Sequence, residues 1–334
     1  MKKPLLLALL FLPAAAGAST VTIKLGTLAP SGSIWHDALK DLAQRWGEAS
    51  GGQVKVRVYP GGVQGGEGDM VRKLAIGQLQ AAGISNVGMH DIVNEPQTFS
   101  TPLLFADEEE MDCTFSRVKD KLEAALRQRG FVVLQWSRLG SATFFCDRPF
   151  RTPAEMARAK MYAWEGDPAM VKAWRAAGFH PVVLSSADLL PALTTGMVDC
   201  VGNVPIYMLS SRLFERARYM IDLPVGSLLG ATIVRKDAWD RIPAELQPRL
   251  LEISREIGAK IDAEVRRLNA DAVSAMRGQG LEIVPVSPEA WRPTLEQSWS
   301  VIRGEVVSAE FFDEVKATRD ACRAGGASGP PGGR

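Results

Sequence analysis

Apolar and polar positions along this chain follow two periods, one typical of strands and one typical of helices. The stretch VTIKLGTLA alternates apolar and polar residues, as a half-buried strand does. In SIWHDALKDLAQRWGEASGG the apolar residues from Ile34 to Trp46 recur at helical spacing, and Gly51 and Gly52 end the run. VKVRVYP alternates again and ends at Pro60. The beginning of the chain therefore predicts a strand, a helix and a second strand.

The same succession continues through most of the chain. A glycine-rich loop, GGVQGGEGD, leads into the helix MVRKLAIGQ and the short buried strand LQAAGIS. Further strands are predicted for GFVVLQW, SATFFC, AKMYAW, FHPVVLS, MVDCVG and GATIVRK. Strands that alternate with helices indicate an α/β fold with parallel strands. The last large element is a long helix over residues 243–280, with a bend at Gly258.

These elements fall into two α/β units, and GATIVRK returns to the sheet of the first. We expect lobe I to comprise residues 19–141 and about 230–270, and lobe II to comprise 142–229 and about 271–322. Two lobes joined by chain crossings leave a cleft, where small ligands commonly bind. The element pattern therefore predicts two α/β lobes with a cleft between them.

The two ends of the chain differ from the rest in composition. The first residues, MKKPLLLALLFLPAAAGAST, place two lysines before a short apolar run and small residues, which predicts a signal peptide (residues 1–18) cleaved after Ala18. The tail, residues 323–334, is rich in Gly and Pro and is expected to be disordered. The product would be exported to the periplasm, and a net charge of +1 does not indicate nucleic-acid binding.

Four cysteines allow three disulfide pairings in an oxidising compartment: Cys113, Cys146, Cys200 and Cys322. Buried free thiols are an equal alternative. Their spacing fits no zinc motif.

Catalytic motifs are missing from the sequence. The three histidines, His36, His90 and His180, lie far apart, and neither HExxH nor GxSxG occurs. The glycine-rich loop lacks the third glycine of a dinucleotide site and the lysine of a P-loop. An enzyme is therefore not expected, nor is a cofactor, and a two-lobed protein of this kind indicates capture of a solute by lobe closure.

Several stretches resemble the solute-binding subunits of tripartite ATP-independent periplasmic (TRAP) transporters, of the DctP type. They are LGTLAPSGSIWHDALKDLAQRWGEASGGQVKVRVYPGG, KLAIGQLQAAGIS, RPFRTPAEMARAKMYAW, SSADLLPALTTGMVDCVGN and AWDRIPAELQPRLLE. The resemblance covers nearly the whole chain after residue 18. It implies the two-lobed periplasmic binding protein fold, with hinge strands and one long helix spanning both lobes. It also implies delivery of a small ligand to membrane permease subunits.

One departure from the family bears on the ligand. The family strand K-I-R-V-P carries an arginine that binds a substrate carboxylate, and here Tyr162 stands at that arginine and Trp164 at the proline. A second family arginine is replaced by Ala142, with Phe144 following. A carboxylate buried without a cation is costly. The resemblance with this departure implies a ligand that is apolar or weakly polar, with a ring or a hydroxyl group.

Eight residues are therefore candidates to line the ligand site. They are Tyr162, Trp164, Phe144, Asn203, Asn86, Ser33, Trp35 and Tyr207. Each has a structural alternative, because aromatic residues on strands usually belong to a core and Ser33 is suited to cap a helix.

Three alternatives remain. The same fold could carry a hydrophobic ligand to a periplasmic tetratricopeptide-repeat protein or a sensor. An organic acid could be bound through an arginine that a shifted alignment would supply, Arg158 or Arg138. An enzyme on this fold is the third.

Overall fold

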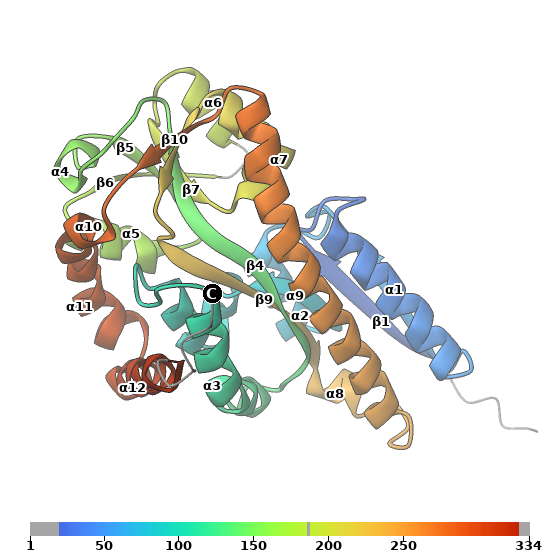
Figure 1. Ribbon diagram of the computed structural model, residues 1–334. Coiled ribbons are helices and arrows are strands. Elements are labelled where there is room, and N and C mark those ends of the chain that lie inside the picture. Colours follow the sequence, from blue (N-terminus) through green and yellow to red (C-terminus); the bar gives the residue numbers. More distant parts are fainter. Residues whose placement is uncertain (1–19, 186–187, 327–334) are drawn as a thin grey trace, which may run out of the picture.

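The computed structural model describes residues 20–185 and 188–326. Its strands are β1 (Val21–Thr27), β2 (Val54–Tyr59), β3 (Ala81–Ser85), β4 (Phe131–Cys146), β5 (Lys160–Trp164), β6 (His180–Leu184), β7 (Cys200–Asn203), β8 (Tyr219–Asp222), β9 (Gly226–Arg235) and β10 (Glu282–Pro285). Its helices are α1 (Ile34–Ala49), α2 (Glu67–Ala75), α3 (Glu108–Gln128), α4 (Pro153–Met156), α5 (Pro168–Ala176), α6 (Leu189–Thr194), α7 (Pro205–Ser210), α8 (Lys236–Trp239), α9 (Gln247–Gly278), α10 (Pro288–Leu295), α11 (Trp299–Val301) and α12 (Ala309–Gly326). Figure 1 shows them arranged as two α/β lobes.

The first lobe is built on the strands predicted from the beginning of the chain. β2, β1 and β3 are parallel, and β9 joins β3 in the antiparallel direction. The predicted return of GATIVRK to the first sheet is therefore confirmed. α1 buries Leu39, Leu42 and Trp46, the face its periodicity predicts. The indole of Trp46 donates to the Leu250 carbonyl at 3.0 Å, which joins α1 to α9.

β4 is one strand of 16 residues, so the prediction of two separate strands is wrong. Gly140, with φ of 114°, and Ser141 separate its two apolar runs and resemble a turn in the sequence. The strand instead bends at register shifts near Gln135 and Gly140, because bulges kink a strand without ending it. Residues 131–142 pair with β9, and Thr143 to Cys146 pair with β7, so β4 crosses between the lobes.

The second lobe continues this sheet through β7, β5 and β6. β5 and β6 are parallel, as the strand–helix–strand pattern predicts. The sequence did not reveal β8 and β10, which pair with each other in parallel. Each has only four residues and joins segments more than 60 positions apart, so neither carries a clear local signal.

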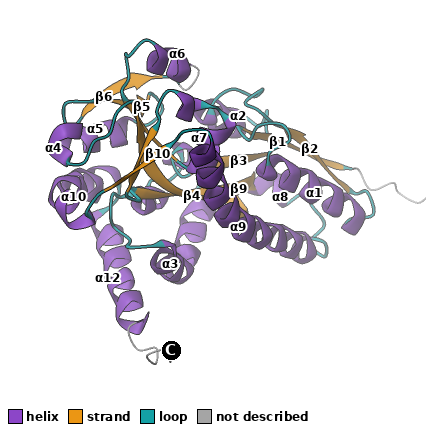
Figure 2. Cartoon of the chain, turned by 45° about the horizontal axis from the view of Figure 1, so that its top comes forward, coloured by secondary structure: helices purple, strands orange, loops and turns teal. Residues whose placement is uncertain are grey.

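α9 confirms the expected long helix across both lobes. Ile253, Ile257 and Ile261 pack in the core of the first lobe, and Met276 packs in a core of the second. Figures 1 and 2 both show α9 lying across β4 and β9. A bend was predicted at Gly258, but α9 continues through this residue as one uninterrupted helix. A Cβ atom there would lie 2.8 Å from the Trp136 carbonyl oxygen, so glycine allows α9 to approach β4.

Two disulfides form, Cys113–Cys322 and Cys146–Cys200. They select one of the three pairings left open and exclude free thiols. The tail was predicted to be disordered from residue 323, but α12 continues to Gly326. The predicted signal peptide and the rest of the tail lie outside the described residues.

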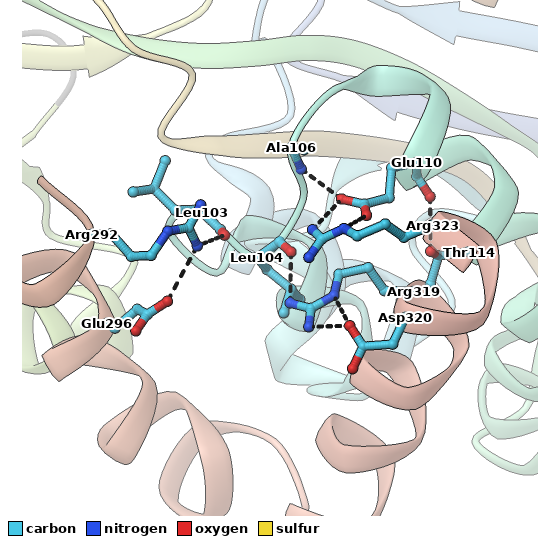
Figure 3. A network of polar contacts seen from close by, with 10 residues as sticks. All are labelled: Leu103, Leu104, Ala106, Glu110, Thr114, Arg292, Glu296, Arg319, Asp320 and Arg323. Carbon is cyan, nitrogen blue, oxygen red and sulfur yellow. Dashed lines mark hydrogen bonds and ion pairs between the residues drawn. The ribbon is translucent and has the colours of Figure 1, made fainter. Parts of the chain in front are cut away.

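The α3–α12 seam consists of Glu110, Cys113, Arg319, Cys322 and Arg323. Arg323 donates to both oxygens of Glu110 at 2.6 and 3.1 Å, beside the Cys113–Cys322 disulfide. Arg319, only 6% exposed, donates to the Leu104 carbonyl at 2.9 Å. Figure 3 shows these contacts closing α12 against the loop before α3.

Candidate functional site

The cleft between the lobes holds two adjoining chambers. Chamber 1 has a volume of about 540 Å³ and lies among the β1–α1 loop, β4, β9, α7 and α9. Chamber 2, of about 710 Å³, lies between the start of α2 and the end of β3 on one side and β5, α5 and β7 on the other. The residues common to both are Leu28, Glu67, Ser85, Asn203, Tyr207 and Leu228.

The end of β5 places the two predicted aromatic residues in chamber 2. Tyr162 and Trp164 stand two positions apart on one face of the strand, and both line the chamber. The indole of Trp164 folds over Gly166, where a Cβ atom would lie 2.5 Å from the ring. The turn after β5 therefore helps to place this indole.

Two phenol groups face the cleft without partners. Burial raises the pKa of Tyr162 and also that of Tyr207, and the nearness of Tyr207 and Glu165 adds to the shift at Tyr162. Within residues 20–185 and 188–326, neither hydroxyl makes a hydrogen bond. Each can therefore donate to a bound molecule or accept from it.

Phe144 and Asn203 lie on neighbouring strands, β4 and β7. Phe144 is 1% exposed, packs against the Trp174 ring at 5.6 Å and presents part of its surface to chamber 2. The side-chain oxygen of Asn203, Oδ1, accepts a hydrogen bond from the Val204 backbone amide at 2.8 Å. Its side-chain amide nitrogen makes no hydrogen bond in the described chain, so it remains available in the cleft.

Ser33 and Trp35 line chamber 1 at the start of α1. Ser33 also caps the helix, because its hydroxyl accepts from the His36 amide at 3.3 Å. The indole nitrogen of Trp35 is buried and has no hydrogen-bond partner. This donor lies against the chamber without being used by the fold.

Asn86 is placed differently from the other candidates. It is fully buried and lines neither chamber. Its side chain donates to Ser100 at 2.6 Å and accepts from the Leu229 amide at 3.3 Å. Asn86 therefore ties the end of β3 to β9.

Sequence analysis missed three polar residues of the cleft. Glu67 belongs to the glycine-rich stretch GGVQGGEGD and begins α2, and its side chain accepts from the Ser85 amide and hydroxyl, each at 2.6 Å. Asp167 caps α5 by accepting from the Met170 amide at 3.0 Å. Burial raises the pKa of both carboxyl groups. Glu67 could have been noticed in the sequence, because it is an acidic residue among glycines in the loop that follows the strand VKVRVYP.

Gln135 is the third, and it stands at the first register shift of β4. It is 4% exposed and lines chamber 1. Its carbonyl oxygen has no hydrogen-bond partner, which costs about 1–3 kcal/mol in a folded protein. No pattern in GFVVLQW distinguishes this position from an ordinary strand residue.

No lysine, arginine or histidine belongs to the described lining of either chamber. Tyr162 and Ala142, at the two positions of the family arginines, both line chamber 2. Arg138 turns toward α3 and α9, where it pairs with Asp112 at 2.5 Å, and Arg158 is exposed on the turn before β5. A shifted alignment therefore does not supply a cleft arginine.

The described segments offer neither a metal site nor a membrane-spanning helix. They contain no group of three His, Cys, Asp or Glu side chains arranged to bind a metal ion. Across the same part of the chain, every helix is too short or too polar to cross a bilayer.

The chain was compared with known families and proteins. The family model described as "Bacterial extracellular solute-binding protein, family 7" (DctP) matches residues 25–304. A C4-dicarboxylate-binding periplasmic protein, DctP, of Rhodobacter capsulatus is 25% identical over 83% of this chain and 84% of its own length.

Solved structures show the same fold. A TRAP periplasmic solute-binding protein of Xanthobacter autotrophicus Py2, with bound β-D-galacturonate, covers 89% of this chain and 99% of its own at a TM-score of 0.82 and 14% identity. One of Sulfurospirillum deleyianum, with bound succinate, covers 90% and 99% at 0.79 and 22% identity. These similarities carry the two-lobed fold.

Proposed function

Because this chain belongs to family 7 of the bacterial extracellular solute-binding proteins, the DctP type of TRAP transporters, we propose that it captures a small non-carboxylate ligand in its cleft and delivers it to the membrane permease. Proteins of this family are periplasmic, bind small molecules and work with membrane permease subunits. The tetratricopeptide-repeat alternative gains no support from the comparisons. An enzyme is not expected of this family.

Capture would use the strands that cross between the lobes. β4 and β9 pair with each other along 131–142 and 226–235, and both contribute to the floor of the cleft. Bending at these strands would bring Tyr162 of the second lobe toward the Ser33 loop of the first. The ligand would then lose its contact with water on both sides.

The cation-free lining of the cleft is the observation that carries the ligand class. Relatives with bound galacturonate and succinate hold carboxylates. A carboxylate enclosed here would meet Tyr162 and Ala142 where the resemblance predicts arginines. Losing its hydration would cost several kcal/mol with no cation to offset the loss. An apolar or weakly polar ligand, with a ring or hydroxyl beside Tyr162 and Trp164, avoids that cost.

A screen by thermal shift and calorimetry tests this proposal. Succinate, other C4-dicarboxylates, uronates and sialic-type acids form one panel, and aromatic solutes, sterols and lipids form the other. We expect stabilisation by members of the second panel alone. Tyr162→Phe and Asn203→Ala should weaken binding of the best ligand while leaving the unliganded protein folded.

The opposite result would be tight binding of a small dicarboxylate that Tyr162→Phe or Asn203→Ala abolishes. That outcome would show that this cleft binds organic acids without an arginine. The delivery step has its own test, since co-purification with two membrane permease subunits is expected and its failure would count against TRAP transport.

A further inference from the structure

Carboxylates give chamber 2 a negative lining. Glu67, Asp69, Glu165 and Asp167 all line it. Asp69 forms an ion pair with Arg72 outside the chamber. In the described chain the other three carboxylates have no ion-pair partner, and their recorded hydrogen bonds come from uncharged donors. These carboxyl groups therefore lie in the cleft without a lysine or arginine beside them.

Glu67 occupies the central position among these groups. It is 5% exposed and lines both chambers. Its two oxygens offer about four acceptor directions; Ser85 occupies two of them, and the Gly88 amide also donates to this carboxylate. Since burial disfavours its charged form, a cation placed beside it would relieve a cost that the unliganded protein bears.

His90 is a basic side chain near these acids, and it does not line the cleft. Its charged form acts on both Glu67 and Asp167. However, its Nε2 atom lies 3.2 Å from Asp91, its Nδ1 atom lies 2.8 Å from the Val87 carbonyl, and it lines neither chamber. The space beside Glu67 is left to a ligand.

A second observation points to the same ligand chemistry. Gln135 is 4% exposed and lines chamber 1. Within the described chain its side-chain carbonyl oxygen has no hydrogen-bond partner, so a donor on the ligand would satisfy it. The remaining lining of chamber 1 is mostly apolar, and its acidic residue is Glu67. The described lining of both chambers thus offers hydrogen-bond acceptors and contains no lysine, arginine or histidine.

Aromatic rings complete the surroundings of the acids. Tyr162, Trp164, Trp174 and Phe144 line chamber 2, and Tyr207 lines both chambers. Faces of such rings attract cations, and the attraction is stronger when the cation is desolvated. Carboxylates and aromatic rings without a lysine or arginine favour a positively charged nitrogen and disfavour an anion.

We propose that the ligand carries a protonated amine, held at Glu67 among the aromatic rings of chamber 2, on a largely apolar body that extends into chamber 1 and carries a hydrogen-bond donor for the Gln135 carbonyl. This rests on the proposed function and narrows its ligand from apolar or weakly polar to an apolar body with one basic nitrogen. Glu165 at the exposed rim and Asp167 deeper in the chamber add to the attraction.

Matched probes test the charge directly. Tryptamine, tryptophol and indole-3-propionate share one ring system and differ in charge, and decylamine, decanol and decanoate do the same for an alkyl chain. We expect the amine of one series to bind about 10- to 100-fold more tightly than its alcohol, which is the range for hydrogen bonds to charged groups. The carboxylates should not bind.

Charge-removing variants locate the effect. Glu67→Gln should reduce the preference for the amine over the alcohol to about twofold. Should Glu67→Gln fail to fold, Asp167→Asn serves the same purpose, because asparagine keeps the cap of α5 while removing one charge. Glu252→Gln is the matched control: Glu252 is an exposed residue of α9 that pairs with Arg249 and lines neither chamber, so the preference should persist.

Two results would overturn the inference, and they differ in what they leave standing. Equal binding of amine and alcohol, unchanged in Glu67→Gln and Asp167→Asn, would refute the amine and leave a neutral ligand of the proposed function. Tight binding of the carboxylate member would refute both the amine and the proposed ligand class.

Discussion

The α3–α12 seam and the cleft are both polar and partly buried, yet their charged groups are arranged in opposite ways. In the seam the Glu110 carboxylate meets Arg323, and the Arg319 guanidinium meets the Leu104 carbonyl and Asp320 (Figure 3). In the cleft, no lysine, arginine or histidine among the described residues lines the chambers beside Glu67, and within the described chain the Gln135 side-chain carbonyl has no hydrogen-bond partner.

The difference separates groups that maintain the fold from groups kept for a ligand. A buried polar group without a partner lowers stability, so a stable protein normally pairs it. Seam residues obey this rule, and substitutions there should reduce stability. Cleft residues depart from it, so substitutions there should alter binding while changing stability little or even raising it.

Removal of the seam disulfide should have the largest effect. Cys113→Ala together with Cys322→Ala opens a cross-link between residues 209 positions apart. We expect the free energy of unfolding to fall by about 4 kcal/mol, because the unfolded chain gains freedom. Denaturant titration under oxidising conditions measures it, and ligand affinity should not change. An unchanged midpoint would show that the seam does not depend on its cross-link.

Replacement of the buried seam arginine should have the next largest effect. Arg319→Met leaves the Leu104 carbonyl without its donor and should cost about 2 kcal/mol. Arg292→Met is the matched control, because the Arg292 side chain is 43% exposed and its hydrogen bond to the Leu103 carbonyl is long, at 3.5 Å. The two melting temperatures should differ clearly; equal losses would remove the distinction between buried and exposed members of this network.

Glu67 gives a smaller and pH-dependent effect. Burial raises the pKa of Glu67 above its ordinary 4.5, so its contribution to stability is present below that pH and is lost as the pH rises through the folded-state value. Glu67→Gln lacks this loss. Unfolding free energies measured at about pH 5 and pH 8 should therefore shift in favour of the variant at the higher pH. A shift in favour of the wild type would mean that Glu67 behaves like a paired seam residue.

Gln135 should show the smallest change. Gln135→Met removes a buried carbonyl oxygen without a partner and keeps most of the volume, at the cost of a long 3.5 Å contact from its amide to Thr232. The unliganded protein should gain about 1 kcal/mol, while affinity for the best ligand falls. Calorimetric unfolding with and without ligand measures both. A loss of stability without ligand would place Gln135 among the groups that maintain the fold.

Much of the architecture could be predicted from local patterns. The alternation in VKVRVYP and the helical spacing from Ile34 to Trp46 located β2 and α1. Both elements bury one face, and the period of the apolar residues shows which face that is. The continuity of β4 through Gly140 could not be predicted. It depends on pairing with β9, some 90 positions later in the chain, which holds a glycine in an extended strand.

The candidate site was predicted in part. Seven of its eight residues line a chamber, and the resemblance to the family directed attention to the strand end at Tyr162. Asn86 was a candidate because the resemblance places its loop among the regions that touch the ligand, yet its side-chain amide bonds to Ser100 and Leu229. A polar residue after a strand has no local signal for which neighbour will take its hydrogen bonds.

By itself, the sequence determined the α/β class, the helix and strand order and the absence of the family arginines, since these depend on residue type and spacing along the chain. Only the tertiary structure decided which cysteines pair and that Glu67 lines both chambers. It also decided that, among the described residues, no other lysine or arginine lines the cleft in place of the missing arginines. Those properties arise when segments far apart in sequence meet. Whether a side chain is buried, and which partner it bonds to, depends on contacts between these segments, so neither can be predicted from one segment alone.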